Sequence, residues 1–463
     1  MPRSRRTRAR SLLGDLGMEV FDFQAKAVSE CLRAVDDRDR LLVQAPTGSG
    51  KTLISQLAIA VYADELPDRY PRALVIVPSR GLLAQHFYDA GWLRSRHLAL
   101  HMLDSDLEVH RFGTLLDSYG VFFSTPVTLN NRLQYFSEAL AGFDLVIFDE
   151  IDTYLTVDEL DERRDTWPVL QSVLESGLPV VGFTGTNLEQ HQLNAWEGRA
   201  FATYQAEVPA DWMPQTRVQF LGIDDPDVIL QDAAIREDLS KAFGGLPGGS
   251  NMTWGAIKAL AREGDKNALA VLRLCGERLR LFESPGSNLQ KYERLAEDAV
   301  RRGPCLVMSR YVDVAQALES VLSARLPTRQ IDGQQPREQI RSGMEWFRER
   351  PKGEEAALVM TRDLGGRGLD FPAAESVLFV SPRSNYQTVA QEIARIRSRA
   401  GAVKQSTIYF YAGTEEQAKA QRLAAHMQAQ TFRDANLFEL ADPPEAVELR
   451  DFESRNMAYE ESL

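Results

Sequence analysis

A glycine-rich segment that ends in a lysine and a threonine, Ala45–Thr52, carries the clearest chemical signal in the sequence. The apolar run Leu41–Val43 precedes it, and an apolar run that suits a helix, Leu53–Tyr62, follows it. A strand, a glycine-rich turn and a helix in this order let backbone N–H groups converge on phosphate oxygens, and the helix N-terminus adds a positive dipole end. The segment therefore predicts a binding site for a nucleoside triphosphate.

The residue types in this loop indicate what each residue would do. Lys51 would reach the β- and γ-phosphates, which makes it a binding residue and a catalytic one, and Thr52 would ligate Mg²⁺. The other residues expected to cradle the nucleotide are Thr47, Gly48, Ser49 and Gly50. ATP and Mg²⁺ are therefore the expected cofactors.

An acidic element, Asp149–Asp152, follows the apolar run Leu145–Phe148. Carboxylates at the carboxyl end of a buried strand face the edge at which α/β sheets bind ligands. Asp149 would hold Mg²⁺, directly or through water, and Glu150 would orient and activate an attacking water molecule. Together with the phosphate loop, this element predicts hydrolysis of the bound nucleotide.

Short apolar runs alternate with longer amphipathic stretches in two parts of the chain, which predicts buried strands alternating with helices. The predicted fold class is therefore α/β, with two doubly wound parallel-sheet domains in tandem. The first set of predicted strands comprises Leu41–Val43, Ala73–Val77, Val121–Phe123, Leu145–Phe148 and Val180–Phe183. The second set comprises Cys305–Met308, Ala357–Met360, Ser376–Val380 and Thr407–Tyr411.

Changes in composition divide the chain into four predicted parts. These are a basic N-terminal arm at 1–20, a first domain at 21–205, a second domain at 206–425 and an acidic C-terminal tail at 426–463. Residues 226–290 of the second domain carry apolar positions at helix-face spacing without a strand-like run, so they predict a small helical insertion. The arm could be a flexible segment that contacts a phosphate backbone, or a disordered tail.

The bulk composition limits the class of protein. The 463 residues include 44% hydrophobic residues, enough for two or three cores. The formal net charge of −13 argues against a surface coated in nucleic-acid-binding charge, although a basic groove on an acidic body remains compatible with it. The sequence lacks an apolar run of membrane-spanning length and the apolar core of a secretory signal. With three widely spaced cysteines, this predicts a cytoplasmic protein without a membrane partner.

These motifs, in this order, resemble the superfamily 2 helicases of the DExD/H-box type, and the resemblance runs from about Phe21 to Ala425. Ala45–Thr52 matches the form A-x-x-G-x-G-K-T, and Asp149–Asp152 reads D-E-I-D, the spelling of the ATPase motif. Phe183–Thr186 is similar to the motif that couples hydrolysis to domain movement. The resemblance implies two RecA-like domains, an ATP-binding one and a helicase C-terminal one, with ATP bound between them.

The resemblance also implies further nucleotide contacts. Phe21 and Gln24 stand in an element that reads adenine, for which the Gln24 amide offers a donor and an acceptor. Asp370 ends a segment similar to the fifth motif and would contact the ribose. Arg395 and Arg397 lie in a segment similar to the sixth motif, Q-x-x-G-R-x-R, and are the candidate arginine fingers. We expect one main finger and leave open which of the two it is.

Other strand-end segments resemble motifs that contact the nucleic-acid backbone. Hydroxyls, arginines and backbone amides at such positions suit phosphate contacts. Thr361 and Arg362 compete for one position, because many relatives carry a threonine where Arg362 stands. The implied nucleic-acid contacts are Ser79, Arg80, Thr125, Ser309, Arg310 and Thr361.

The predicted function is that of an ATP-dependent helicase or translocase that acts on DNA or RNA. Two alternatives stay open. One is a protein-translocating motor, because Gly365–Gly368 also resembles the fifth motif of such motors. The other is a nucleotide-switched subunit of a larger defence or repair complex with protein partners. The spelling of the sixth motif and the helical insertion are similar to the RIG-I-like branch and to restriction-type helicases.

Overall fold

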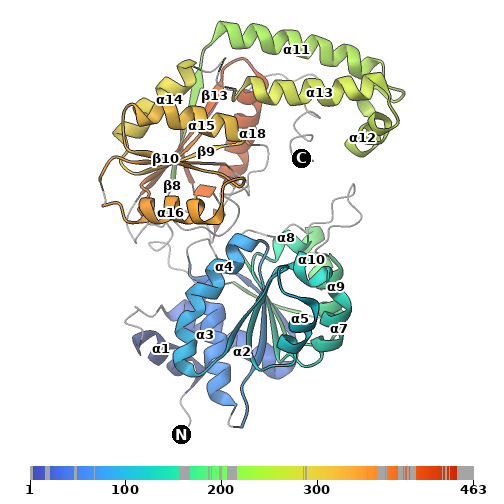
Figure 1. Ribbon diagram of the computed structural model, residues 1–463, viewed down its shortest axis with the longest axis vertical. Coiled ribbons are helices and arrows are strands. Elements are labelled where there is room, and N and C mark those ends of the chain that lie inside the picture. The colour runs from blue at the N-terminus through green and yellow to red at the C-terminus, as the bar shows by residue number, and fades with distance from the viewer. Residues whose placement is uncertain are drawn as a thin grey trace. The chain divides into compact units, whose positions relative to one another are not determined.

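The computed structural model of the protein (Figure 1) divides its described residues into two compact units, one up to residue 205 and one from residue 216. The predicted domain boundary at 205/206 adjoins residues outside the described part of the chain and stays a prediction. The described residues are 4–15, 21–45, 49–66, 68–155, 167–185, 188, 190–197, 201–205, 216–284, 286, 289–351, 353–361, 371, 373–383, 389, 392–393, 396, 403–429, 431–432, 435–436 and 438–445.

The first unit is built on a seven-stranded sheet in the order β3-β4-β2-β5-β6-β1-β7, in which every neighbouring pair is parallel. The sheet contains all five strands predicted for this unit, which confirms the doubly wound α/β fold class. Its two edge strands, β3 and β7, were not predicted. The strands are β1 Arg40–Gln44, β2 Arg72–Ile76, β3 Leu100–Leu103, β4 Gly120–Ser124, β5 Leu145–Phe148, β6 Val180–Thr184 and β7 Phe201–Gln205.

Helices cover both faces of this sheet (Figure 1), with α3 and α4 on one side and α5, α7 and α9 on the other. Buried aromatic and aliphatic side chains, including Phe112, Phe136, Phe148 and Trp196, form the core beneath the second group. The helices are α1 Arg5–Asp15, α2 Asp22–Asp37, α3 Lys51–Glu65, α4 Arg80–Asp89, the 3₁₀ helix η1 Ala90–Arg96, α5 Val109–Leu116, α6 Pro126–Asn130, α7 Leu133–Leu140, α8 Asp152–Leu155, α9 Trp167–Glu175 and α10 Gln190–Glu197.

The basic N-terminal segment differs from the expected free arm, because its described part is the helix α1. Arg5 lies 2.7 Å from the Glu65 carboxylate and 2.6 Å from that of Asp36, and Arg8 lies 3.3 Å from Glu65. These acids belong to α2 and α3, so ion pairs hold α1 on the first unit.

The second unit is built on a seven-stranded sheet in the order β10-β11-β9-β12-β13-β8-β16, again with parallel neighbours. All four strands predicted here are present, and β16 adds a strand from within the predicted acidic tail. The strands are β8 Thr216–Ile223, β9 Cys305–Ser309, β10 Thr328–Ile331, β11 Ala357–Thr361, β12 Ser376–Phe379, β13 Lys404–Tyr411 and β16 Phe438–Ala441, with a separate antiparallel pair of β14 Thr431–Phe432 and β15 Ala435–Asn436.

The helices of the second unit include a group that stands apart from the sheet. In Figure 1, α11 and α13 run side by side away from the sheet and α12 lies at their far end. Asp225, Thr253 and Asp265 cap the N-termini of these three helices. The helices are α11 Pro226–Gly244, the 3₁₀ helix η3 Gly249–Asn251, α12 Trp254–Arg262, α13 Lys266–Leu281, α14 Leu289–Arg301, α15 Val312–Ser323, α16 Arg337–Arg348 and α18 Glu415–Ala429.

The three helices α11, α12 and α13, which lie in the predicted helical insertion, have an apolar core of their own. It includes Leu239, Phe243, Trp254 and Ile257, and Val271 from α13 completes it. Because each helix buries one apolar face against the other two, the group needs no strand to cover it. None of the described helices is both long enough and apolar enough to cross a membrane.

A cluster of buried charged side chains links the helices α11 and α13 to α18. The Arg278 guanidinium of α13 is fully buried and lies 2.6 Å from Asp232 of α11 and 2.5 Å from Glu415 of α18. The Lys419 ammonium lies 3.0 Å from Glu415. Burial raises the pKa of Asp232 and lowers the pKa of Lys419, so in each case the environment works against the charged form. The cluster is tolerated because its charges are paired.

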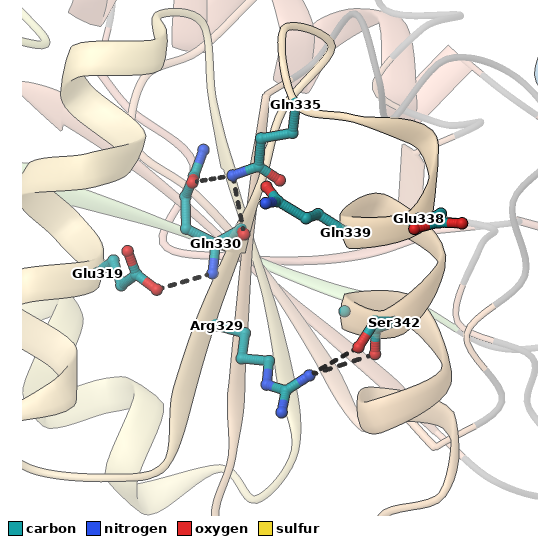
Figure 2. Close-up of a pocket in the computed structure, with 8 residues that line it drawn as sticks. Glu319, Arg329, Gln330, Gln335, Glu338, Gln339 and Ser342 are labelled. Carbon is teal, nitrogen blue, oxygen red and sulfur yellow. Dashed lines mark hydrogen bonds between the residues drawn. The ribbon is translucent and has the colours of Figure 1, made fainter.

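The edge strand β10 carries polar side chains rather than an apolar face. Glu319 accepts a hydrogen bond from the Gln330 backbone N–H at 3.1 Å, and Gln335 donates to the Gln330 side-chain oxygen at 2.7 Å. Figure 2 shows these residues around a polar cavity of about 370 Å³ beside α16, with Arg329 near Ser342. Such polar side chains can form hydrogen bonds with the backbone groups of the free edge and disfavour pairing with another strand.

The buried charge cluster generates the first prediction. Arg278→Met would leave the Asp232 and Glu415 carboxylates buried without their main partner, so we expect a loss of about 3–5 kcal/mol in the free energy of unfolding of the second unit. Urea denaturation followed by circular dichroism measures it. Arg273→Met, on the same helix, is the matched control: it removes an exposed ion pair with Glu277 at 2.7 Å, a loss of at most about 0.5 kcal/mol. Equal losses in the two variants would contradict the account.

Candidate nucleotide-binding site

The carboxyl ends of β1, β5 and β6 bring three sequence-distant segments of the first unit together. The Ala45 N–H donates to the Thr184 carbonyl at 3.0 Å, just beyond the ends of β1 and β6. The Ile151 N–H donates to the Phe183 carbonyl at 2.8 Å, which ties the acidic element after β5 to the same edge. The described ends of the phosphate loop and the acidic element therefore share one edge of one sheet, as the sequence predicts.

Lys51, the first residue of α3, is a buried cation at this edge. Its Nζ lies 3.8 Å from Glu150 Oε1 and donates to the Ala45 carbonyl at 3.4 Å. Its side chain is 7% exposed, so the ammonium depends on these oxygens rather than on bulk water. The structure thus brings together two residues that the sequence predicts to act on the same phosphate group.

Asp149 is a buried acid at this edge, and His86 contacts it. His86 Nε2 lies 3.0 Å from Asp149 Oδ2, and both side chains are buried. Burial alone would raise the pKa of Asp149, but the hydrogen bond from His86 and the positive charge of Lys51 outweigh it and hold the pKa below its ordinary value. Asp149 is therefore a carboxylate at neutral pH, the form that a cation requires.

Sequence reasoning missed His86. The residue lies on α4, directly after Gln85, and a single histidine within a helix follows no pattern that points to a partner on β5. Its position on the helix that begins at the predicted backbone contact Arg80 was the available signal.

The backbone at Glu150 is unusual for a residue with a side chain. Its φ of 51° lies in the left-handed region, which costs an L-residue about 1–2 kcal/mol. Such strain persists only where the surroundings hold it, and here the neighbouring Ile151 N–H is bonded to β6. The conformation places the carboxylate within reach of Lys51.

Gln24 touches the phosphate loop directly. Its Nε2 donates to the Ser49 carbonyl at 3.0 Å, and its side chain is buried. Gly50, with a φ of +85°, leaves room for this contact, because a Cβ at position 50 would lie 2.6 Å from Gln24 Nε2. Phe21, in the same predicted element, precedes α2 and stacks on Phe23 with a centroid separation of 6.0 Å.

The polar atoms present fit a nucleoside triphosphate. Among the described residues, two buried oxygens at this edge lack hydrogen-bond partners, Ser49 Oγ and Gln24 Oε1. Buried polar groups normally have partners, so such atoms are available to a ligand. The described part of the chain holds no cluster of three or more metal-ligating side chains. A Mg²⁺ ion here would therefore take further oxygens from phosphate and water, as this ion usually does.

A second contact links β6 to the acidic element. The Thr184 hydroxyl donates to Asp152 Oδ1 at 3.2 Å, and both residues are buried. Gln192 of α10 donates to the Asp152 carbonyl at 3.2 Å. These bonds hold α8 next to the acidic residues Asp149 and Glu150. Thr186, which ends the predicted coupling motif, lies outside the described residues.

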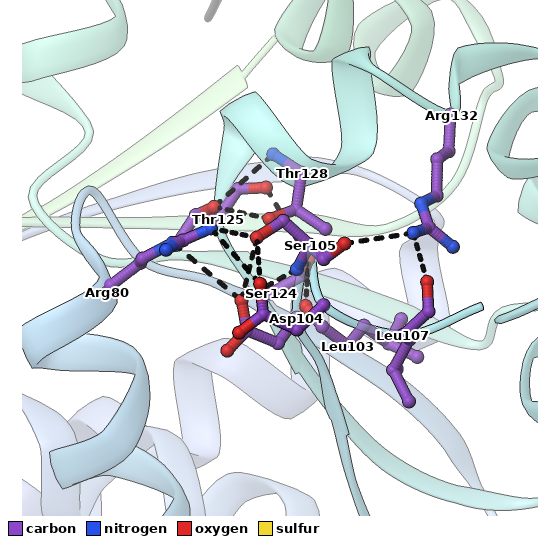
Figure 3. A network of polar contacts seen from close by, with 10 residues as sticks. Arg80, Leu103, Asp104, Ser105, Leu107, Ser124, Thr125, Thr128 and Arg132 are labelled. Atoms are coloured by element: carbon purple, nitrogen blue, oxygen red, sulfur yellow. Dashed lines mark hydrogen bonds and ion pairs between the residues drawn. The ribbon is translucent and has the colours of Figure 1, made fainter. Parts of the chain in front are cut away.

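Two predicted nucleic-acid contacts of the first unit lie where α4 begins. Ser79 caps this helix, because its Oγ accepts from the Leu82 N–H at 3.3 Å. The exposed Arg80 guanidinium bonds the Ser105 hydroxyl and lies 3.7 Å from Asp104 Oδ1. Figure 3 shows Arg80 reaching these residues beyond the end of β3. Arg80 is therefore an accessible cation that two short side chains orient.

Thr125 has a structural role in the same network (Figure 3). It is buried, and its Oγ1 caps α6 by accepting from the Thr128 N–H at 3.3 Å. Arg132 donates to the Ser105 carbonyl at 3.1 Å and to the Leu107 carbonyl, which fixes the loop after β3. The Thr125 side chain therefore faces the protein interior. A contact with nucleic acid at this position would therefore involve nearby backbone groups instead of this side chain.

In the second unit, Ser309 and Thr361 are buried at the ends of neighbouring strands. The Ser309 hydroxyl donates to the Tyr311 carbonyl at 3.2 Å. Arg310 follows β9, and its N–H donates to the Glu283 carboxylate at 2.9 Å. Of these three, Arg310 is the residue with a partly exposed side chain. The predicted site residues that lie outside the described part of the chain are Thr47, Gly48, Asp370, Arg395 and Arg397.

A parallel sheet that holds a glycine–lysine–threonine loop against an aspartate–glutamate pair defines a nucleotide-binding protein of the phosphate-loop class. Residues 21–192 match the DEAD/DEAH box helicase family, and residues 288–400 match the helicase conserved C-terminal domain. The chain therefore carries a DEAD/DEAH box helicase domain followed by a helicase conserved C-terminal domain, as the sequence predicts. The DEAD/DEAH box helicase domain implies use of a nucleotide.

Individual relatives agree with this assignment. The chain is 24% identical over 209 residues to the ATP-dependent DNA helicase Hel308 of Pyrococcus abyssi, a match that covers 44% of this chain and 26% of that protein. The match thus spans about a quarter of the relative's length. Among solved structures, the Pyrococcus furiosus Hef helicase domain (TM-score 0.53, 16% identity, 88% of this chain and 98% of that chain) shares the fold. A variant of Dbp5 from S. cerevisiae bound to RNA and ADP BeF3 (TM-score 0.61, 13% identity, 95% and 93%) shares it as well.

The crowded contact between Gly50 and Gln24 generates the second prediction. Gly50→Ala would strain a left-handed position by about 1–2 kcal/mol and displace the Gln24 amide. We expect about tenfold weaker binding of a fluorescent ATP analogue, measured by titration. Gly14→Ala in α1 is the matched control, because a Cβ there meets no atom within 4 Å. Unchanged affinity in Gly50→Ala would show that the contact plays no part in shaping the site.

Proposed function

We propose that the protein is an ATP-dependent helicase or translocase that acts on DNA or RNA. The observation that carries the proposal is the buried pairing of Lys51 with Glu150 beside that of His86 with Asp149, at the carboxyl edge of one parallel sheet. A buried cation next to two carboxylates suits the β- and γ-phosphates of a nucleotide and a Mg²⁺ ion. The matches to both helicase domains support the same function.

Each residue then has a defined task. Lys51 would neutralise phosphate charge, and Asp149 and the Thr52 hydroxyl would hold Mg²⁺, which supplies further charge neutralisation when it is bound. Glu150 would orient the attacking water and accept its proton. Ser49 Oγ and Gln24 Oε1 would receive the ligand partners that they lack among the described residues.

The remaining nucleotide contacts stay predictions. Thr47 and Gly48 would complete the phosphate loop, Asp370 would contact the ribose, and Arg395 or Arg397 would stabilise charge that develops on the γ-phosphate. All of them rest on the motif resemblance.

Nucleic acid would be held mainly through its backbone. Arg80 is exposed and oriented by Ser105 and Asp104, and Arg310 offers a second partly exposed cation. Ser79 would contribute through the N-terminus of α4. Two similar proteins, named as a DNA helicase and as a protein bound to RNA, support nucleic acid as the substrate class. Backbone contacts predict salt-dependent binding with little sequence preference.

The Lys51 and Glu150 pair generates the third prediction. Lys51→Ala should lower ATP turnover at least about 100-fold, because the phosphates lose a preorganised cation. Glu150→Gln should lower turnover as strongly while ATP stays bound, because the amide keeps the shape but cannot accept a proton. Phosphate release and nucleotide titration measure the two effects. Full turnover in either purified variant would contradict the proposal.

Arg80 generates the fourth prediction. Arg80→Ala should weaken binding of single- and double-stranded oligonucleotides to a similar degree, and the slope of log K against log salt should fall by about one unit. Fluorescence anisotropy at several salt concentrations measures both. Arg69→Ala is the matched control, because Arg69 is a partly exposed arginine that precedes β2, whereas Arg80 follows it. Equal effects of the two variants would argue against a specific contact at Arg80.

A further inference from the structure

Helix α4 connects two features of the first unit that have separate tasks. Its N-terminal end carries Ser79 and Arg80, the candidate contacts for nucleic acid. His86, six residues beyond Arg80 and about 9 Å along the helix axis, contacts the Asp149 carboxylate at 3.0 Å. A single helix therefore joins the predicted nucleic-acid contact to the carboxylate that would hold Mg²⁺.

The packing of α4 makes it a stiff connection. Leu82 and Leu83 are buried under the first turn of the helix. Further along, the Phe87 ring meets the Phe123 ring of β4 edge to face at a centroid separation of 6.1 Å, and the Arg94 guanidinium covers Phe87 at 5.4 Å. A close-packed interior transmits displacement instead of absorbing it, so a shift at Arg80 would move His86.

His86 has few other ties. Within the described part of the chain, its buried Nδ1 has no hydrogen-bond partner, so the bond from Nε2 to Asp149 is the polar contact that sets the ring orientation. His86 contacts the Oδ2 atom of the Asp149 carboxylate and not its Oδ1 atom. An outer partner that fixes one carboxylate oxygen orients the other toward a metal.

We infer that His86 is a positioning residue through which nucleic acid bound at the N-terminus of α4 sets the orientation of the Asp149 carboxylate. The inference rests on the proposed function and adds a physical route by which nucleic acid controls ATP turnover. His86 touches neither the nucleotide nor the attacking water in this scheme and acts through Asp149 alone.

Two substitutions at position 86 separate positioning from general damage. His86→Leu removes the donor and should lower kcat for ATP at saturating nucleic acid about 10–100-fold, with KM for ATP nearly unchanged and the Mg²⁺ requirement shifted upward. His86→Gln keeps an amide N–H that can donate to Asp149, so it should recover most of kcat and the original Mg²⁺ requirement. Thermal melting of both variants shows whether each one folds.

A double-mutant cycle tests the route itself. In the wild type, Arg80→Ala should reduce the stimulation of ATP turnover by a fixed saturating oligonucleotide. In the His86→Leu background the same change should have little further effect, because the connection is already cut. Tyr88→Leu replaces His86→Leu in the control cycle, since Tyr88 is an exposed residue of the same helix. In this control cycle, the effects of Arg80→Ala and Tyr88→Leu on the stimulation should be independent.

The outcomes distinguish this inference from the proposed function. If the wild type hydrolyses ATP and His86→Leu keeps the wild-type kcat and Mg²⁺ requirement, the inference is overturned while the proposed function stands. Independent effects of Arg80→Ala and His86→Leu would overturn it as well. If the wild type does not hydrolyse ATP with any nucleic acid, the proposed function fails, and the inference fails with it.

Discussion

The burial of the Lys51 ammonium is the constraint on which the first unit depends. A cation removed from water must find anionic or carbonyl oxygens, and here they come from Glu150 and Ala45. To supply the Glu150 oxygen, the chain after β5 adopts a left-handed turn. The neighbouring Asp149 is then buried as well and takes a hydrogen bond from His86. The buried Lys51 charge thus accounts for the carbonyl oxygen after β1 and the carboxylates after β5. Through Asp149, it also accounts for the histidine in the middle of α4.

The parallel sheet is what makes this arrangement possible. In such a sheet the carboxyl ends of the strands share one edge, so segments distant in sequence meet without long loops. The apolar sequences of the central strands, such as Leu145–Phe148, bury them on both faces and make the edge rigid. The site gains its precision from strands whose positions are fixed by the core rather than from the loops themselves.

The sequence predicted nine of the ten central strands and none of the four edge strands, for a physical reason. The nine predicted strands are continuous apolar runs. The missed central strand β8 mixes buried and exposed positions, the edge strand β3 includes the half-exposed His101, and β10 reads Thr-Arg-Gln-Ile. Edge strands need polar side chains to satisfy or guard their free side, so they do not stand out as apolar runs. The same logic explains why β16 was assigned to an acidic tail.

The candidate site could be predicted where chemistry and local order coincide. Lys51, Asp149 and Glu150 follow apolar strands in recognisable spellings, and the structure brings them together. His86 could not be predicted because its role arises from packing between α4 and β5. Nor could the burial of Thr125 be predicted, because a hydroxyl after a strand has the same sequence signature whether it caps a helix or faces a ligand.

We propose that nucleic acid controls ATP turnover at the Lys51 site. The most direct test is the ATP hydrolysis rate of the purified full chain, measured without nucleic acid and with single- and double-stranded DNA and RNA of matched length over a salt titration. At least one nucleic acid should raise the rate, and this stimulation should fall as the salt concentration increases. A rate that no nucleic acid changes, or one that unfolded polypeptide raises instead, would contradict it.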